Sequence, residues 1–397
     1  MDDLKKRNIN LMYIITFLNG LVFYAPVAVI YRQQKGLTMM EIFLLESILL
    51  ILVLLLEMPW GYFADRFGYK ITLVASFFVI FLSKIMFFMA NSFYMFLLST
   101  VLTSIGVSGV SGCDSALIYN CIEKENSEKI FGIYNAFNVA GFFLASLLYT
   151  VFIKVSVDFT VKITIIPFLF TFLLSLFLVE INNRENNDGA LEKECFSKVL
   201  KSILNKKEIF LFVISFGIVG EVTHGILVYL NQLQYIKSGI DIGMFGLITA
   251  LTQILCLLSV KTYKVTKRIG QSNTLIILIL SITISIILLI FTTNPIISVL
   301  SIIVIEVAYA MACPINEDIT NKSINIGNRA TVLSIYSMIS SFIGVAINIG
   351  IGKSADISLE FSLGISFVIM IIAIVMILIY FYLDKKFKKV MLKDTDL

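Results

Sequence analysis

Gly61-Tyr62-Phe63-Ala64-Asp65-Arg66-Phe67-Gly68-Tyr69-Lys70 is the stretch that decides the fold. It lies between two apolar runs that are each long enough to cross a bilayer. Its two glycines permit close helix approach and a tight turn. Short polar loops between spanning helices are common, but a glycine, an Asp-Arg pair, a second glycine and a base in this order are not. The pattern therefore predicts a specialised turn between two membrane helices.

The composition indicates that lipid surrounds most of this chain. Hydrophobic residues make up 58% and charged residues 15%, whereas soluble domains carry about 25% charged residues. The first ten residues are polar and mixed in charge, and no small-residue cleavage site follows the first apolar run, so we expect that run to be retained as a helix. The net charge of +4 indicates no nucleic-acid partner, because the basic residues lie in loops.

Twelve apolar runs are candidates for spanning helices, each of which needs about 20 mostly apolar residues. The sequence thus predicts an all-α membrane protein with twelve transmembrane helices. The expected ranges are 9–31, 39–62, 70–91, 93–118, 130–153, 159–180, 207–235, 241–260, 273–293, 295–316, 329–352 and 359–383.

The basic residues predict the orientation of these helices. With the N-terminus inside, the inner segments hold 24 lysines and arginines and the outer segments hold 6, while Lys84 lies within a helix. Lys and Arg collect in cytoplasmic loops. We therefore expect both termini to be cytoplasmic.

A polar segment divides the chain into two halves. Residues 1–180 are predicted to form an N-terminal six-helix bundle, and residues 208–397 a C-terminal bundle with a cytoplasmic tail. In the linker 181–207, apolar residues at helical spacing are surrounded by lysines. This pattern is typical of a basic amphipathic helix on the inner membrane surface, and equally of a solvated linker helix.

The two halves are predicted to be related repeats. Asn19-Gly20-Leu21-Val22-Phe23-Tyr24 is similar to His224-Gly225-Ile226-Leu227-Val228-Tyr229, and Arg66-Phe67-Gly68 is similar to Arg268-Ile269-Gly270. Together these matches favour two six-helix repeats related by an axis along the membrane normal. In such a design the substrate site lies between the halves, near the midplane.

The stretch 61–70 resembles the signature loop of the major facilitator superfamily, a family of secondary transporters, although Tyr69 stands where that family usually has a base. Residues 111–119 resemble the end of helix four in a bacterial, drug-efflux-like branch, and residues 328–334 resemble the start of its helix eleven. The resemblance covers almost the whole chain. It implies the major facilitator fold and a transporter rather than an enzyme.

The resemblance also implies a gating role for the signature loop, which in the family acts as a latch towards helices four and eleven. The gating residues implied here are Gly61, Asp65, Arg66, Gly68, Lys70 and Asp114. We expect Asp65 at the start of the third helix, where its charge suits the helix dipole, and Asp114 as a partner of Arg66. The alternative is that Asp65 is only a helix cap and that the bases only set the topology.

Two departures weaken the likeness to drug–proton antiporters. Those proteins often carry an arginine within helix four and a Gly-Pro-Gly-rich pattern on helix five. Here helix four has no arginine, and the glycine-containing part of helix five has no proline. Export is therefore less secure than the fold.

Ionisable residues at membrane depth are candidates for ion coupling or substrate contact. A charge at the bilayer centre costs roughly 2.5–3.5 kcal/mol even on the gentlest scale. Glu221 and His224 lie three residues apart on the seventh helix and could take up and release a proton. Glu306 in the tenth helix and Lys84 in the third are further candidates, and the alternative is a static ion pair between these two.

Polar and aromatic residues on the two related helices are the expected cavity lining: Asn19, Tyr24 and Tyr229. We find no nucleotide-binding loop, no nucleophile constellation and no metal-ligand spacing among the five cysteines. We therefore expect no catalytic residues, no metal, no cofactor and no disulfide.

The sequence as a whole predicts a monomeric transporter that works by alternating access in contact with membrane lipids. The expected function is export of a small, partly apolar molecule as an antiporter driven by a proton or other ion gradient. The alternatives are uptake of a nutrient and, less favoured, a non-transporting membrane sensor on the same fold.

Overall fold

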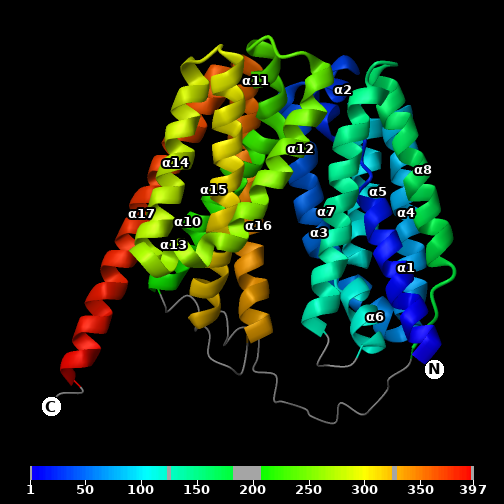
Figure 1. Ribbon diagram of the computed structural model, residues 1–397, viewed down its shortest axis with the longest axis horizontal. Coiled ribbons are helices and arrows are strands. Elements are labelled where there is room, and N and C mark those ends of the chain that lie inside the picture. The colour runs from blue at the N-terminus through cyan, green and yellow to red at the C-terminus, as the bar shows by residue number, and fades with distance from the viewer. Residues whose placement is uncertain (1, 123–126, 182–206, 324–328, 395–397) are drawn as a thin grey trace. The chain divides into compact units, whose positions relative to one another are not determined.

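The computed structural model describes residues 2–122, 127–181, 207–323 and 329–394, and these residues form helices joined by short turns (Figure 1). Within them, twelve helical segments are long and apolar enough to cross a membrane. These segments are Asp3–Gln34, Met39–Phe67, Tyr69–Met89, Phe93–Cys121, Ser127–Phe152, Val157–Ser175, Glu208–Lys237, Ile242–Ile269, Gln271–Phe291, Pro295–Lys322, Val332–Ile357 and Leu359–Leu383. The prediction of an all-α protein with twelve membrane helices is confirmed.

The helices group into two compact units, each described here on its own. The first unit comprises Met1–Asp188 and Ile240–Gln253, and the second comprises Gly189–Gly239 and Ile254–Leu397. The first contains α1 (Asp2–Gly20), η1 (Ala25–Val27), α2 (Ala28–Gln34), α3 (Met39–Phe67), α4 (Tyr69–Met89), α5 (Phe93–Val110), α6 (Cys113–Cys121), α7 (Ser127–Phe152), α8 (Val157–Ser175), η4 (Ile242–Met244) and most of α12 (Phe245–Cys256).

The second unit contains the remaining helices. They are α10 (Lys207–His224), the π-helix η3 (Gly225–Leu230), α11 (Asn231–Lys237), η5 (Leu257–Lys261), α13 (Thr262–Ile269), α14 (Gln271–Phe291), α15 (Pro295–Lys322), α16 (Arg329–Ile357) and α17 (Leu359–Asp394). The division differs from a simple half-and-half cut, because Tyr149 on α7 donates a hydrogen bond of 2.8 Å to the carbonyl of Ile242. The predicted boundaries at 180 and 208 remain a proposal, and the predicted amphipathic helix lies mainly outside the described residues.

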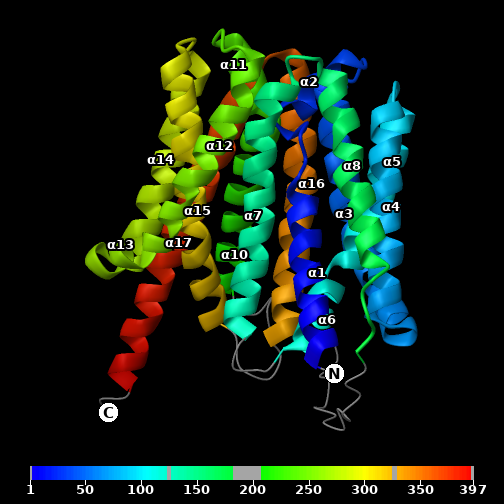
Figure 2. The ribbon, with the colours of Figure 1, turned by 45° about the vertical axis from the view of Figure 1, so that its right-hand side comes forward.

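The buried core of the first unit forms where α1, α4 and α8 pack together, and α7 also lies against α1 (Figure 2). Met12 and Ile15 on α1 are buried with Leu73 and Phe77 on α4 and with Phe168 on α8. Burying such side chains contributes about 1.5–3 kcal/mol each in water. In a bilayer, van der Waals packing between helices provides much of the stabilisation instead.

Many of the buried hydroxyl groups donate to a carbonyl in the preceding turn of their own helix. Ser76 donates to the carbonyl of Thr72, Ser104 to that of Thr100, and Thr252 to that of Ile248. This bonding to the preceding turn lets Ser and Thr sit at membrane depth without an unpaired donor. Serines and threonines therefore occur throughout spans that the sequence identifies by hydropathy.

The signature stretch is helical on both sides of a single glycine turn. α3 continues to Phe67, Gly68 takes a φ of 92°, and α4 begins at Tyr69. The prediction that Asp65 stands at the start of the third helix is therefore wrong. Asp65 lies in the last turn of α3, because the chain reverses only where glycine permits a positive φ.

The same turn recurs in the second unit, at Gly270. This residue has a φ of 86° and stands between α13 and α14. Thr72 donates its hydroxyl to the carbonyl of Gly68 at 2.9 Å, and Thr274 does so to Gly270 at 2.7 Å. The shared geometry supports the predicted internal repeat.

A second shared feature is an interruption in the first helix of each repeat. α1 ends at Gly20, before a turn that leads to η1, while α10 ends at His224 and continues as the π-helix η3. These are the two segments that the sequence comparison aligned. Discontinuous helices and π-helices often mark binding sites in membrane proteins.

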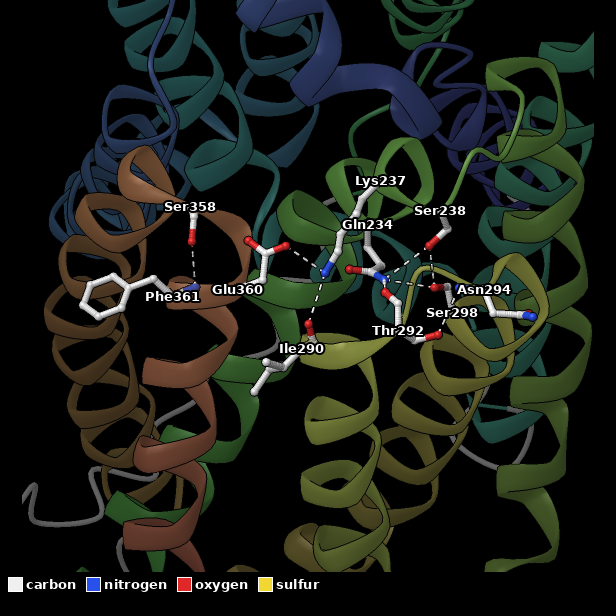
Figure 3. A network of polar contacts seen from close by, with 10 residues as sticks. All are labelled: Gln234, Lys237, Ser238, Ile290, Thr292, Asn294, Ser298, Ser358, Glu360 and Phe361. Carbon is white, nitrogen blue, oxygen red and sulfur yellow. Dashed lines mark hydrogen bonds and ion pairs between the residues drawn. The ribbon is translucent and has the colours of Figure 1, made fainter.

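A polar network closes one end of the second unit (Figure 3). The amide of Gln234 donates to the hydroxyl of Ser298 at 2.9 Å and to the carbonyl of Thr292 at 3.2 Å. Lys237 forms an ion pair of 2.8 Å with Glu360. The network ties α11 to the α14–α15 turn and to the start of α17, so it holds the end of the interrupted seventh span in place.

Candidate functional site

Glu221 is the carboxylate at the centre of the second unit. It lies on α10, three residues before the π-helix, and its side chain is half-buried. Its carboxyl carbon lies 2.6 Å from the point where a Cβ atom on Gly344 of α16 would stand. Only glycine at 344 leaves room for the carboxyl group, so the position of Glu221 depends on a residue 123 positions away.

The contact of α10 with α16 also extends one turn towards the start of each helix. One turn earlier on each helix, Gly217 faces Ser340. One turn later on α16 is Asn348, which is fully buried and whose amide oxygen and nitrogen have no hydrogen-bond partner among the described residues. A buried amide without a partner is unusual and indicates a place for water or an ion.

α15 contributes an aromatic and polar stripe beside Glu221. The Tyr309 hydroxyl lies 3.0 Å from the position of a Cβ on Gly220, and its ring stacks on Phe216 with a centroid distance of 6.1 Å. The Tyr309 hydroxyl also bonds to the Cys313 thiol. Tyr309, Cys313 and Glu317 follow one another at four-residue spacing and form a stripe along α15 that begins beside Glu221.

A cavity of about 470 Å³ lies at the end of this stripe. It is bounded by α10, α15 and α16, and its lining residues are Val213, Phe216, Gly217, Asn316, Glu317, Thr320, Asn321, Leu333, Tyr336, Ser337 and Ser340. Since Gly217 and Ser340 line it, the cavity ends one helical turn before Glu221 and Gly344.

His224 and Glu306 have separate surroundings. The His224 ring meets Tyr229 of the π-helix edge to face, with centroids 5.9 Å apart. Glu306 on α15 lies beside Tyr235 and accepts a hydrogen bond from the Cys256 thiol. The structure thus places Glu221 and His224 on neighbouring turns, each with its own packing partner.

Lys84 occupies the corresponding region of the first unit. Its ammonium group donates to the Tyr24 hydroxyl at 3.2 Å and lies 4.8 Å from the centre of the Phe168 ring. Tyr24 stands directly before η1, at the interruption of the first span. Asn19 is close by in sequence, and its amide oxygen is buried without a partner in the described part. Lys84 and Glu306 belong to different units, and their ion pair remains a prediction.

The signature turn is held by a residue that the sequence did not indicate. The carboxylate of Glu180 accepts hydrogen bonds from the backbone amides of Tyr69 at 3.1 Å and of Lys70 at 2.7 Å. A carboxylate at the first amides of a helix also stabilises its dipole. Glu180 therefore fills the role at the start of α4 that the sequence assigned to Asp65.

The predicted contact of Arg66 with Asp114 is wrong. Asp114, half-buried on α6, accepts a hydrogen bond of 2.8 Å from Tyr134 on α7. Arg66 is exposed and lies over the ring of Phe67 at 5.4 Å. The break at Gly112 turns α6 away from α5 and brings Asp114 to α7. Asp65 and Lys70 flank the turn, whereas Gly61 lies inside α3, seven residues before Gly68. The gating role of all three remains a proposal.

Several features of the site are absent from the sequence argument. Gly344 and Tyr309 lie beside Glu221 on other helices, Asn348 is one turn beyond Gly344, and Glu180 reaches the signature turn from the segment after α8. A buried amide and a mid-helix glycine are weak signals in one sequence. Among the described residues there is no group of three or more His, Cys, Asp or Glu side chains that could hold a metal ion. The four described cysteines form no disulfide.

This fold, with its repeated glycine turn and its charged residues at interrupted spans, defines a membrane transporter. Residues 11–348 match the Major Facilitator Superfamily, and the chain belongs to that family. Members of the family are transporters and not enzymes, and they carry small molecules.

Sequence relatives are distant. The chain is 25% identical over 364 residues to the transporter MJ1560 of Methanocaldococcus jannaschii, which covers 89% of this chain and 92% of that protein. It is 24% identical to YxaM of Bacillus subtilis, but the match spans only about half of either protein, 52% of this chain and 53% of YxaM. It is 23% identical to the quinolone resistance protein NorA of Staphylococcus aureus over 60% of this chain and 63% of NorA.

The fold is similar to that of solved transporters. The nucleoside transporter NupG superposes with a TM-score of 0.81 at 15% sequence identity, covering 95% of this chain and all of NupG. At that identity the likeness establishes the major facilitator fold and nothing of the substrate.

Proposed function

We propose that this transporter exports a small, partly apolar molecule in exchange for protons, by alternating access in a bacterial cytoplasmic membrane. Both termini lie on the cytoplasmic side, and the protein works as a monomer surrounded by lipid. The observation that carries the proposal is the packing of Glu221 against Gly344, between a cavity and the π-helix η3.

Glu221 has the surroundings that a proton-coupling group needs. A carboxylate inside a membrane span must be protonated, ion-paired or hydrated for part of the transport cycle. The cavity ends one turn before it, and the Tyr309–Cys313 hydrogen bond extends from its level towards the cavity. Glu221 takes up a proton when one side is open and releases it when the other side is open.

His224, Tyr229 and Glu306 act around this carboxylate. The His224 ring packs on Tyr229 within the π-helix region. Glu306 is the second candidate for the coupling group. Export as the direction is supported by the likeness to NorA, whose name is that of a drug-resistance protein.

The test uses purified protein in liposomes. A thermal-shift screen first identifies a ligand, because ligands that bind the folded state raise its melting temperature. Uptake of that ligand is then measured with an imposed pH gradient in either direction, for the wild type, Glu221→Gln and the exposed control Glu128→Gln.

Glu221→Gln should keep ligand binding and exchange but lose accumulation driven by the pH gradient, while Glu128→Gln should behave as the wild type. Accumulation by Glu221→Gln at the wild-type level would contradict the coupling role and shift attention to Glu306. Accumulation only when ligand and protons move together would establish uptake, the alternative function. No flux of any bound ligand would favour a membrane sensor.

A further inference from the structure

Three basic residues in the first unit lie on a continuous aromatic stack. Tyr24 stacks on Phe87 with centroids 4.7 Å apart, and Phe87 stacks on Tyr31 at 5.4 Å. The ammonium group of Lys84 lies 5.7 Å from the Tyr24 centroid. The Arg32 guanidinium lies 5.3 Å from the Phe87 ring centroid, and the Lys35 ammonium group lies 5.2 Å from the Tyr31 ring centroid.

The charges along this stack are poorly balanced. Lys35 forms an ion pair of 2.8 Å with Asp158. In the described ranges, neither Lys84 nor Arg32 has a carboxylate partner, and the Nε atom of Arg32 is buried without an acceptor. Aromatic faces attract cations but leave their hydrogen-bond donors unused.

Lys84 is placed to receive a ligand rather than to fix the fold. It lies within the third span, five residues before the end of α4, remains half-buried, and has buried Tyr24 and Phe168 as its neighbours. Its contacts are one hydroxyl oxygen and two ring faces, which leaves ammonium donors available. A cation at membrane depth without an anionic partner is a functional candidate.

We propose that Lys84 binds the anionic group of the transported molecule, which is an aromatic or otherwise apolar carboxylic acid. The carboxylate pairs with Lys84, the apolar body lies against Phe168 and Tyr24, and Arg32 draws the anion along the stack. This assignment rests on the proposed transport function and names the substrate class of that site.

The experiment measures the affinity of the purified full-length protein for 1-naphthoate and for its neutral counterpart 1-naphthamide, at constant ionic strength. The variants are Lys84→Met, Lys84→Arg and Arg32→Met. The control is Lys154→Met, which removes an exposed lysine of the same unit. Melting temperature without ligand and monodisperse elution verify that each variant is folded.

The wild type and the Lys154→Met control should bind naphthoate roughly tenfold or more tightly than naphthamide, as expected for a hydrogen bond to a charged group. Lys84→Met should lose this preference, Lys84→Arg should keep part of it, and Arg32→Met should weaken it. If Lys84→Met does not fold, Arg32→Met and Lys84→Arg decide the matter. The assignment is overturned if both variants prefer naphthoate to naphthamide as strongly as the wild type does.

Other outcomes are equally decisive. Absence of any preference for naphthoate in the wild type, or an unchanged preference in folded Lys84→Met, would overturn the proposal. Stabilisation by sodium chloride equal to that by naphthoate would assign the site to an inorganic anion instead. Transport of neutral or cationic compounds without naphthoate binding would leave the proposed function standing and refute only the anion site.

Discussion

The carboxylate of Glu180 occupies the space that a side chain on Gly68 would need. One of its oxygens lies 2.7 Å from the position of a Cβ on Gly68, and the same carboxylate accepts the amide hydrogens of the next two residues. The end of the sixth span is thereby fastened to the turn between the second and third. The turn depends on glycine for two reasons, the positive φ and the proximity of this carboxylate.

Gly68→Ala and Gly270→Ala separate these two reasons. Both glycines have a positive φ, 92° and 86°, but no atom lies within 4 Å of a Cβ on Gly270. Their ψ angles of 158° and 153° are extended, and this combination with a positive φ is open almost only to glycine and costs another residue on the order of 1–3 kcal/mol. We expect both variants to lower the melting temperature, and Gly68→Ala to lower it further because Glu180 must move. Equal decreases in melting temperature would show that the Glu180 carboxylate can move away without loss of stability.

Asp65→Asn and Glu180→Gln should have opposite effects on stability. Asp65 is exposed in the last turn of α3, where a negative charge opposes the helix dipole. Its neutralisation should leave the melting temperature unchanged or slightly higher, and should reduce flux if the turn acts as a latch. Glu180→Gln should lower the melting temperature, since the dipole interaction contributes about 0.3–1 kcal/mol, and up to about 2 when partly buried. Wild-type flux in Asp65→Asn would leave the latch without support.

The membrane spans could be predicted because lipid imposes a length and a hydropathy on every spanning helix. All twelve expected ranges overlap a helix of the structure. The ends could not be predicted equally well. The second helix runs to Phe67 rather than 62, because its end is set by Gly68 and by a carboxylate more than 100 residues away.

The candidate residues were visible as charges at membrane depth, but their partners were not. Glu221 and Lys84 are conspicuous in apolar runs, whereas the residues that position them, Gly344 and Phe168, look like ordinary residues of other helices. Contacts between distant helices cannot be read from spacing in one sequence. The predicted pairing of Arg66 with Asp114 failed for the same reason.

Gln234 should be important for the stability of the second unit. Its side chain is almost fully buried and donates hydrogen bonds to Ser298, to Ser238 and to the carbonyl of Thr292 (Figure 3). Gln234→Leu keeps the volume but removes the donor to the Thr292 carbonyl and one partner of each serine, at a cost of about 1–3 kcal/mol. We expect a lower melting temperature, with the exposed Gln34→Leu as the control. Equal melting temperatures would mean that the 2.6 Å hydrogen bond between Ser238 and Ser298 is sufficient without the amide.

The proposed orientation is tested with single cysteines in a background in which the five native cysteines are replaced by serine. Thr293 is exposed in the turn before α15, and the basic residues place that turn outside and Asn187 inside. A membrane-impermeant maleimide should label Thr293→Cys in intact cells and Asn187→Cys only after lysis. Labelling of Asn187→Cys in intact cells would reverse the orientation.

Gly344→Ala should disable Glu221 without altering the carboxylate itself. The added methyl group would stand 2.6 Å from the Glu221 carboxyl carbon and must displace the side chain or separate α10 from α16. Gly350→Ala is the matched control, because it lies on the same helix and no atom stands within 4 Å of its Cβ position. We expect Gly344→Ala to express normally and to lose most pH-driven accumulation, as Glu221→Gln does, while Gly350→Ala transports as the wild type.

The double variant Gly344→Ala with Glu221→Gln should be no worse than Glu221→Gln alone, since both changes act on one group. A clearly additive loss would show that Gly344 serves helix packing independently of the carboxylate, and that the position of Glu221 is not what couples transport to protons.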